Sequence, residues 1–235
     1  MKSKSLRLGV FGASGRLGRA IAALALTDPR FTLAAALTHA QSSHLGENLG
    51  PPGPVLETTL RTKVDLLIDA SLPPGLSSRL ALAMDLKIPI VIGTTGFTDA
   101  EHQLLKNAST QIPVFHASNF SIGMAVMRKL ARETARLFPS AQVDLIETHH
   151  SQKKDLPSGS ALLLAKSIPQ PVKIHSLRSG TVIGDHILLF NTPDERLTLS
   201  HEAHSRDVFA RGALVAAAFL FAQKPALYGM EDIVA

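Results

Sequence analysis

The sequence predicts an α/β fold: a Rossmann-like doubly wound parallel sheet, followed by a second α+β domain with a mostly antiparallel sheet. Short apolar segments alternate with helical patterns over the first half of the chain, which is typical of βαβ units. A glycine-rich turn, GASGRLG, follows the first apolar segment, as in dinucleotide-binding folds. Beyond about Phe120 the pattern changes to a long helix and to alternating apolar and polar residues, which favour antiparallel strands.

In the first half, the pattern distinguishes strands from helices by length and periodicity. Strands are predicted at 6–11, 31–37, 64–69, 88–92 and 113–115, and helices at 17–26, 76–86 and 100–109. Residues 46–54 are rich in Gly and Pro and are predicted to form a loop. Because the strands are almost continuously apolar, we expect a parallel sheet that is covered on both faces.

The second half predicts a different arrangement. A helix is expected at 123–137, a strand at 143–148, a helix beginning at Ala161, and strands at 186–190 and 196–200. An apolar helix at 212–223 and the tail to Ala235 are expected to return to the first domain. We therefore predict one domain formed by residues 1–120 with 208–235, and a second formed by 121–207.

The composition excludes several classes of protein. Of the 235 residues, 45% are hydrophobic and 18% are charged, so the chain can bury a large core. The chain has no cysteine, which excludes disulfides, thiolate metal sites and a cysteine nucleophile and fits a reducing compartment, so we expect a cytoplasmic protein.

The charge and hydropathy patterns also bear on partners. The net charge of +5 is spread along a chain with only 5% aromatic residues, so we expect a small anionic ligand and no nucleic acid. The apolar stretch at 212–223 is shorter than a membrane span requires, so we expect no membrane partner.

The turn Gly12–Gly18 lies where the first strand leads into a helix. Glycines let the backbone approach a pyrophosphate, which the N–H groups of the helix N-terminus can bind. The G-x-x-G-x-x-G spacing differs from the standard fingerprint, and a simple packing turn could use the same glycines. Its place at the end of the first strand favours nucleotide binding.

The end of the second strand, Thr38-His39, is where such folds read the adenosine ribose. An acid there favours NAD, but neither residue is acidic, and Arg16 offers a cation nearby. The choice between NADH and NADPH therefore stays open. Gly93-Thr94-Thr95-Gly96 follows another apolar strand, where the threonines could hold an amide group or the segment could be a plain turn.

The densest group of reactive side chains lies in Glu147–Ser160, ETHHSQKKDLPSGS. Pro-Ser-Gly-Ser ahead of an apolar helix leaves N–H groups and hydroxyls for a carboxylate. His149, His150 and Lys153 place proton donors nearby, although solvated or structural roles would explain each of them alone. For both adjacent histidines to serve one site, the strand must end near them. We expect anion binding and proton transfer here.

His201-Glu202-Ala203-His204 resembles a zinc-protease motif but is one residue short of H-E-x-x-H. The two histidines therefore do not have the spacing of one helical turn, and the preceding alternation predicts a strand end. We expect no metal site.

Taken in order, the motifs resemble the 4-hydroxy-tetrahydrodipicolinate reductase (dihydrodipicolinate reductase) family, along nearly the whole chain. They are GASGRLG at 12–18, IDASLPPG at 68–75, VIGTTGF at 91–97, ASNFSIGMAVM at 117–127, ETHHSQKKDLPSGSA at 147–161, LRSGTVIGDH at 177–186 and SRDVFARGA at 205–213. The H-H-x-x-K-x-D-x-P-S-G block is specific to that family, whereas the glycine turn is not.

The resemblance implies an enzyme that passes a hydride from NADH or NADPH to a cyclic imine carrying two carboxylates, in lysine and diaminopimelate biosynthesis. It implies a dinucleotide-binding first domain, a second domain for substrate binding and oligomerisation, and a homotetramer. By resemblance, His149 is the proton donor and Lys153 a second donor or electrostatic partner. The substrate carboxylates would be held by His150, Ser158, Gly159 and Ser160. The cofactor contacts would be Gly12, Ala13, Ser14, Gly15, Arg16, Leu17, Thr38, His39, Gly93, Thr94, Thr95, Ala117, Ser118, Asn119 and Phe120.

The sequence departs from the family where Thr38-His39 replaces a charged pair and where the connection 166–175 is short. Two other functions are compatible with the fold. One is a different imine or oxo-acid reductase, similar to aspartate dehydrogenase, against which the family-specific block argues. The other is a non-catalytic NAD(P)H sensor, against which His149 and Lys153 together argue.

Overall fold

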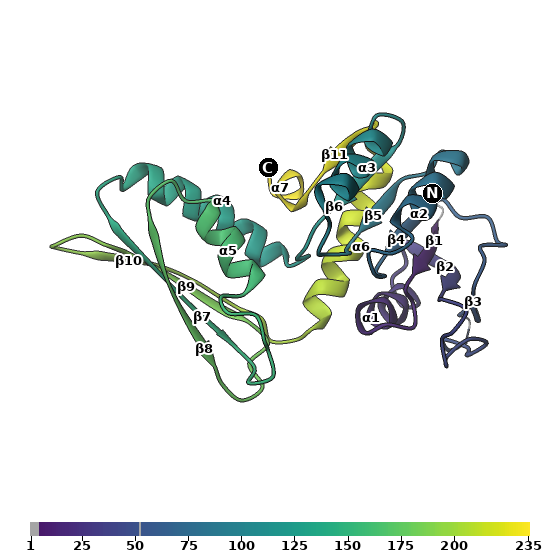
Figure 1. Cartoon of the computed structure of the whole chain (residues 1–235), viewed down its shortest axis with the longest axis horizontal. Helices are drawn as coiled ribbons and strands as arrows, with labels where there is room; N and C mark the ends of the chain where they lie inside the picture. Colours follow the sequence, from purple (N-terminus) through teal and green to yellow (C-terminus); the bar gives the residue numbers. More distant parts are fainter. Residues whose placement is uncertain (1–4, 52) are drawn as a thin grey trace. The chain divides into compact units, whose positions relative to one another are not determined.

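The computed structural model describes residues 5–51 and 53–235, and the chain divides into two compact units (Figure 1). The first unit contains the described residues up to Phe120 together with Phe209–Ile233 and Ala235, and the second contains Ser121–Val208 with Val234. Position 52 of the predicted loop 46–54 and the first four residues of the predicted first domain lie outside the described residues.

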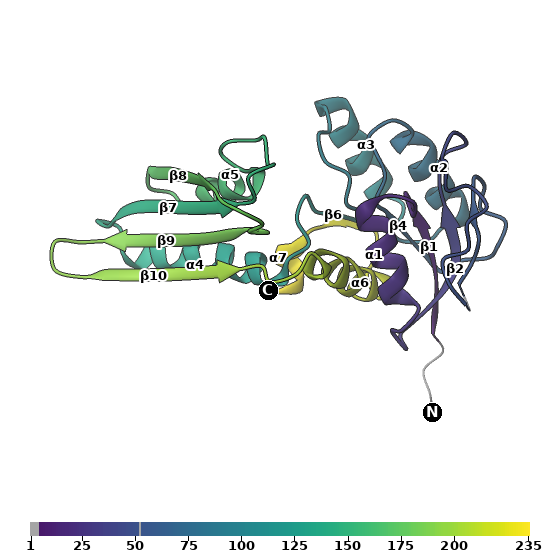
Figure 2. The same cartoon turned by 90° about the horizontal axis from the view of Figure 1, so that it is seen from below.

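The first unit is built on a parallel sheet with the strand order β11-β6-β5-β4-β1-β2-β3. The strands are β1 (Leu6–Phe11), β2 (Phe31–Leu37), β3 (Leu56–Glu57), β4 (Leu66–Asp69), β5 (Ile90–Ile92), β6 (Pro113–His116) and β11 (Ala226–Tyr228). The helices are α1 (Arg16–Ala25), α2 (Leu76–Leu86), α3 (Asp99–Ser109), α6 (Asp207–Phe221) and α7 (Met230–Ile233). Figure 2 shows α2 and α3 on one face of the sheet and α1 and α6 on the other.

This layering explains the apolar strands. Leu80 of α2 and Leu105 of α3 pack in one core cluster with Leu67 of β4, while Phe115 of β6 contacts the ring of Phe219 of α6 on the other face. A strand with helices on both faces must be apolar on both sides. Although α6 is rich in Ala and Leu, none of the helices in the described ranges is both long and apolar enough to cross a membrane.

The second unit is a four-stranded sheet with two helices against one face. The strands are β7 (Gln142–His149), β8 (Val172–Arg178), β9 (Asp185–Asn191) and β10 (Arg196–Glu202), and the helices are α4 (Ile122–Leu137) and α5 (Gly159–Lys166). The order is β10-β9-β7-β8 (Figure 2), with β7 and β8 parallel and the other pairs antiparallel. Leu145 and Phe190 from the sheet pack with Met127 of α4 and Leu164 of α5.

The predicted fold class is confirmed, and several boundaries differ from those predicted. The strands β3, β8 and β11 were not predicted: β8 lies partly in the stretch 166–175, and no residue of β8 is fully buried. The helix α6 begins at Asp207, five residues before the predicted start at Gly212, because the charged Asp207 and Arg211 interrupt the apolar stretch on which the prediction rested.

Candidate functional site

The predicted cofactor residues of the first unit lie at one edge of the sheet. The strands are parallel, so their carboxyl ends share an edge, which is where ligands bind in open α/β sheets. The structure brings to this edge Gly12–Leu17 after β1, Thr38-His39 after β2, Gly93–Thr95 after β5 and Ala117–Phe120 after β6.

The glycine turn has the geometry needed for a dinucleotide. Gly12 has φ +71°, and a Cβ there would lie 2.6 Å from the carbonyl oxygen of Ala70; a Cβ at Gly18 would lie 2.1 Å from that of Gly12. Gly15, the residue before α1, makes no side-chain cap, and the first turn has no acidic residue. The helix therefore presents N–H groups and a positive dipole without a competing carboxylate, which fits a pyrophosphate.

The residues expected at the ribose lie beside this turn. Thr38 is buried, and its hydroxyl is 2.7 Å from that of Ser14. His39 and Arg16 are exposed. Arg19, which the sequence did not single out, donates to the Ser14 carbonyl and forms an ion pair of 2.7 Å with Glu47. Arginine, histidine and hydroxyl side chains thus lie near the turn where the ribose is predicted to bind.

The two threonines of the segment after β5 differ. Thr94 is buried, and its hydroxyl donates to the Ser71 carbonyl at 2.9 Å, whereas Thr95 is exposed. The loop containing Ser71 is held in turn by the buried Asp69, whose carboxylate pairs with Arg79 at 2.6 Å. The Thr94 hydroxyl therefore fixes the loop, and the Thr95 hydroxyl is the one that faces outward.

The predicted substrate residues all lie in the second unit. Strand β7 ends at His149, as required for both histidines to serve one site; His149 is buried and His150 is half-buried. The Lys153 ammonium lies 2.8 Å from the Asp155 carboxylate. The hydrogen bond from Lys153 lowers the pKa of Asp155 below its usual value despite some desolvation.

The N-terminus of α5 is the second part of this group. Ser158 is buried, and its Oγ accepts from the Ala161 N–H at 3.2 Å, so it caps the helix. The Gly159 N–H donates to Asp155 at 3.4 Å, and a Cβ on Gly159 would meet no atom within 4 Å. Ser160 is half-buried. The open first turn of α5 thus already holds one carboxylate.

The structure adds Glu147, to which the sequence analysis assigned no role. Glu147 is fully buried; one carboxylate oxygen accepts from His149 Nδ1, and the other accepts from Arg178 at 3.0 Å and from the Ser158 N–H at 3.3 Å. Burial would raise its pKa, but hydrogen bonds from Ser176, Arg178 and His149 outweigh burial and lower it. The Glu-x-His spacing was the available signal, because residues i and i+2 of a strand share a face.

Burial lowers the pKa of both histidines near this carboxylate. Burial lowers the pKa of His149, a change that Glu147 opposes and that the charges of Lys153 and Arg178 reinforce. The ring of His186 packs edge-on against His149 with centroids 5.4 Å apart. Burial, with the nearby charge of His149, lowers the pKa of His186 to about 4.

The His201–His204 motif lies at the end of a strand, since β10 extends to Glu202, and the His201 ring is 3.1 Å from the Ser121 hydroxyl. In the ranges 5–51 and 53–235, no three His, Cys, Asp or Glu side chains come together as a metal site would require.

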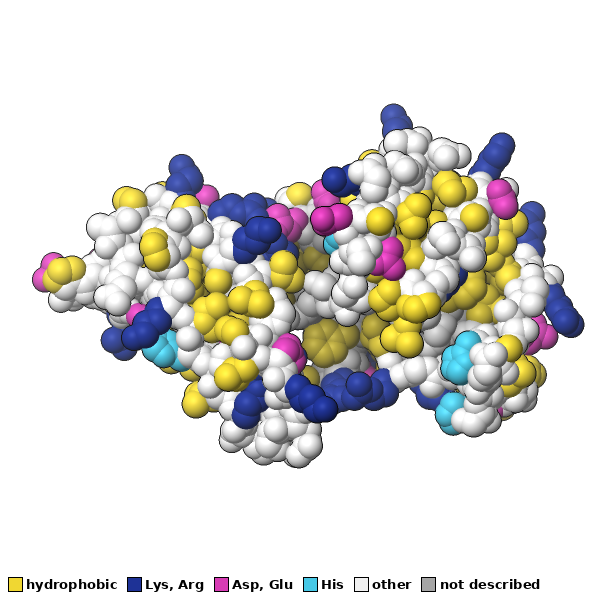
Figure 3. Space-filling model, viewed as in Figure 1, with side chains coloured by type: hydrophobic (Ala, Val, Ile, Leu, Met, Phe, Trp, Pro, Cys, Tyr) yellow, Lys and Arg dark blue, Asp and Glu magenta, His cyan; other side chains and the backbone are white. Residues whose placement is uncertain are grey.

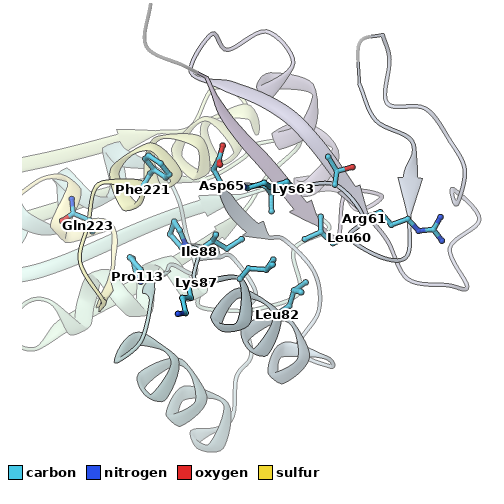
Figure 4. Close-up of a pocket in the computed structure, with 14 residues that line it drawn as sticks. Leu60, Arg61, Lys63, Asp65, Leu82, Lys87, Ile88, Pro113, Phe221 and Gln223 are labelled. Atoms are coloured by element: carbon cyan, nitrogen blue, oxygen red, sulfur yellow. The ribbon is translucent and has the colours of Figure 1, made fainter.

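A hollow lies away from the predicted residues, at the amino ends of the parallel strands (Figure 4). Leu60, Lys63, Lys87, Ile88, Pro113 and Phe221 are among its lining residues. Figure 3 shows Lys and Arg side chains on several separate parts of the visible face. The lining residues of the hollow include none of the predicted site residues.

A parallel sheet with a glycine turn that fits a pyrophosphate, together with histidines and a lysine beside a helix N-terminus in the second unit, is typical of NAD(P)H-dependent oxidoreductases. Family comparison makes this specific. The family profile described as "Dihydrodipicolinate reductase, N-terminus" matches residues 6–120, and that described as "Dihydrodipicolinate reductase, C-terminus" matches residues 123–234. The chain belongs to the dihydrodipicolinate reductase family.

Individual relatives agree. The 4-hydroxy-tetrahydrodipicolinate reductase of Xylella fastidiosa is 40% identical over 97% of this chain and 98% of its own. The enzyme of the same name from Caldanaerobacter subterraneus subsp. tengcongensis is 35% identical over the same shares. The structure of dipicolinate-bound dihydrodipicolinate reductase from Paenisporosarcina sp. TG-14 superposes with a TM-score of 0.83, at 27% identity, and covers 98% of this chain and 100% of that chain. The resemblance drawn from the motifs is confirmed, and the aspartate-dehydrogenase-like and sensor alternatives are not favoured.

Proposed function

We propose that this chain reduces 4-hydroxy-tetrahydrodipicolinate with NADH or NADPH, and that the second unit supplies the proton and holds the substrate carboxylates. The observation that carries the proposal is the position of Asp155. Its carboxylate contacts both the Lys153 ammonium and the Gly159 N–H, so these two donors are spaced to hold one carboxylate between them. A substrate carboxylate takes the place of Asp155 there.

Each of the remaining groups has its own chemical role in the proposal. His149 is the proton donor, His150 and the first turn of α5 (Ser158–Ser160) hold the carboxylates, and Lys153 adds positive charge beside the developing negative charge. Hydride addition to the ring leaves an electron pair that must be protonated, and a histidine beside the ring can supply that proton.

The cofactor residues of the first unit hold the dinucleotide through the backbone of Gly12–Leu17, with Thr38-His39 and Arg16 at the ribose. The segments Gly93–Thr95 and Ala117–Phe120 line its path along the sheet edge. When bound, the reduced nicotinamide supplies the hydride. This chain's residues bind and orient it, and no carboxylate at Thr38-His39 repels the 2′-phosphate of NADPH.

Activity measurements test the proposal. With freshly generated 4-hydroxy-tetrahydrodipicolinate, we expect wild-type protein to oxidise NADH or NADPH. His149→Ala and Lys153→Ala should each lower kcat, by roughly a hundredfold or more for the proton donor, while the Kd for cofactor stays near that of the wild type.

Lys154→Ala, which removes the neighbouring exposed lysine, is the matched control and should keep normal turnover. If wild-type protein oxidises neither cofactor, the reductase assignment is wrong. If one of the two alanine variants turns over normally, the role of that residue is wrong.

We also propose a cytoplasmic homotetramer. The face of the second sheet opposite α4 and α5 carries the half-buried apolar side chains Ile146, Ile187 and Leu189, and Ile146 is paired with Ile187 in the register of β7 and β9. An apolar sheet face of this kind supports association between copies through the second unit. Use of NAD(P)H and the absence of cysteine support the cytoplasm. We propose that the chain binds a small dicarboxylate substrate and has no nucleic-acid or membrane partner.

A further inference from the structure

We infer that Glu147 is a positioning residue that fixes the protonation geometry of His149, so that Nε2 is the ring nitrogen that delivers the proton, and that Gly184 keeps that nitrogen accessible. The inference deepens the proposed function and rests on it for the role of His149 as the donor. The supporting observations are the surroundings of the two ring nitrogens of His149.

On the first nitrogen, Glu147 accepts a hydrogen bond from His149 Nδ1. A buried carboxylate without a proton can only accept, so Nδ1 must carry a hydrogen in both charge states of the ring. The neutral ring is then the Nδ1–H form, and the proton gained or lost is the one on Nε2.

The carboxylate is kept ionised and in place by donors on its other oxygen. Arg178 Nη1 donates to it at 3.0 Å and the Ser158 N–H at 3.3 Å. The same guanidinium donates through Nε to the Lys153 carbonyl at 3.3 Å. Glu147 and Arg178 thereby join the strand that carries His149 to the loop that carries Lys153 and to the start of α5.

On the second nitrogen, the space is provided by Gly184, a buried residue just before β9. A Cβ built on Gly184 would lie 3.0 Å from His149 Nε2 and 3.3 Å from Cδ2. Any side chain at this position would therefore press on the atom that must approach the substrate. His186 packs edge-on against the same ring and limits its rotation.

The charged and titratable groups that face His149 come from every element around it. They are Glu147 on β7, Lys153 in the following loop, Arg178 on β8 and His186 on β9. Glu147 is the one anion among these four, so it is the group that favours the imidazolium form.

The imidazolium gives its Nε2 proton to the electron pair left on the substrate ring by hydride addition, forming one new bond to hydrogen at the ring. The N–H bond electrons stay on Nε2, and the ring becomes neutral with Nδ1–H still bonded to Glu147. Solvent protons recharge Nε2 before the next turnover.

Glu147→Gln gives a sharp test, because Arg178 and the Ser158 N–H both require an acceptor. They direct the glutamine carbonyl toward themselves and its NH₂ group toward His149 Nδ1. We expect ¹⁵N NMR of histidine-labelled, ligand-free protein to show the neutral His149 as Nδ1–H in the wild type and as Nε2–H in the variant, with a lower His149 pKa. kcat should fall by roughly a hundredfold, with kcat/KM falling in parallel.

Glu147→Asp retains the charge and should restore the wild-type tautomer in part, and Glu195→Gln, in the β9–β10 turn, is the matched control. Gly184→Ala should lower kcat while leaving the neutral ring as Nδ1–H. A wild-type ring in the Nε2–H form, measured without any variant, would overturn the inference, as would an unchanged tautomer and pKa in Glu147→Gln. Because these spectra need no turnover, failure of the reductase assay alone would overturn only the proposed function.

Discussion

At the scale of single residues, the two predicted groups differ in how firmly their side chains are held in place. In the second unit, His149 is held at Nδ1 by Glu147, and Lys153 is held by Asp155. In the first unit, His39 and Arg16, which are predicted to lie at the ribose, are exposed. Proton transfer depends on fixed geometry, whereas attraction of a phosphate depends mainly on charge, which tolerates mobile side chains. Cofactor preference should therefore respond to a single change of charge.

His39→Asp tests this dependence. A carboxylate at this exposed position repels the 2′-phosphate of NADPH and can accept hydrogen bonds from the ribose hydroxyls of NADH. We expect KM for NADPH to rise several-fold more than KM for NADH, with kcat nearly constant for both. Steady-state assays with the two cofactors give the ratio, and His39→Asn is the uncharged control. An equal change in both KM values would place the ribose elsewhere.

At the scale of elements, β7 and β9 carry the buried polar groups of the second unit. Their register pairs Glu147 with His186, and neither ring nitrogen of His186 has a hydrogen-bond partner in the described part of the chain. A neutral, unpartnered histidine next to a sheet carboxylate costs stability when the solution becomes acidic. We expect this loss of stability to affect the paired strands β7 and β9 together.

The pH dependence of stability follows from the pKa of His186. That pKa is about 4 in the folded chain, against an ordinary value of 6.5, so between these pH values the unfolded chain binds more protons. The contribution of this group to the free energy of unfolding is therefore fully present above pH 6.5. It is lost as the pH falls toward 4, by at most about 3 kcal/mol. Hydrogen exchange of the β7 and β9 amides at pH 7 and 4.5 measures the loss.

His186→Gln should reduce this acid loss, whereas His204→Gln, which removes an exposed histidine, should retain it. Identical acid sensitivity in wild type and His186→Gln would show that the buried ring does not govern the stability of these strands.

The elements also show what the sequence could predict. Helix α2 has the predicted bounds, because Gly75 precedes its first residue and the apolar run at 80–84 marks its middle. Strand β8 was not predicted, because the adjacent polar residues His175 and Ser176 obscure the alternation typical of a half-buried strand. The candidate substrate residues were predicted from one motif, and they stay a prediction. The proposed role of Glu147 depends on Arg178, which is distant in sequence and is brought close only by the pairing of β7 with β8.

At the scale of the whole molecule, the proposed assembly depends on the face of the second sheet that lies opposite α4 and α5. Leu177 of β8 is 54% exposed and shares this face with Ile146, since it is paired with Thr148 in the register. Exposed apolar residues on a sheet are costly in a monomer and gain stability when covered. The proposed tetramer would cover them.

Ile187→Arg places a charge at the middle of this face and should reduce the assembly to smaller species. The molar mass from light scattering during size-exclusion chromatography measures the change, and circular dichroism confirms that the variant is folded. Leu72→Arg, at a position in the first unit that is 75% exposed, is the control and should keep the wild-type mass. A wild-type monomer, or a variant of unchanged mass, would contradict this arrangement.

The place of β11 in the first sheet has a consequence for how the protein is made. β11 pairs with β6, yet residues Ser121–Val208 of the second unit lie between them in sequence. A ribosome therefore releases this stretch, which contains all helices and strands of the second unit, before the last strand of the first sheet exists. Domains tend to fold as they emerge, so the second unit can fold while the sheet of the first unit still has an unpaired strand edge at β6. During synthesis, that unpaired edge is open to pairing with a strand of another chain until β11 covers it.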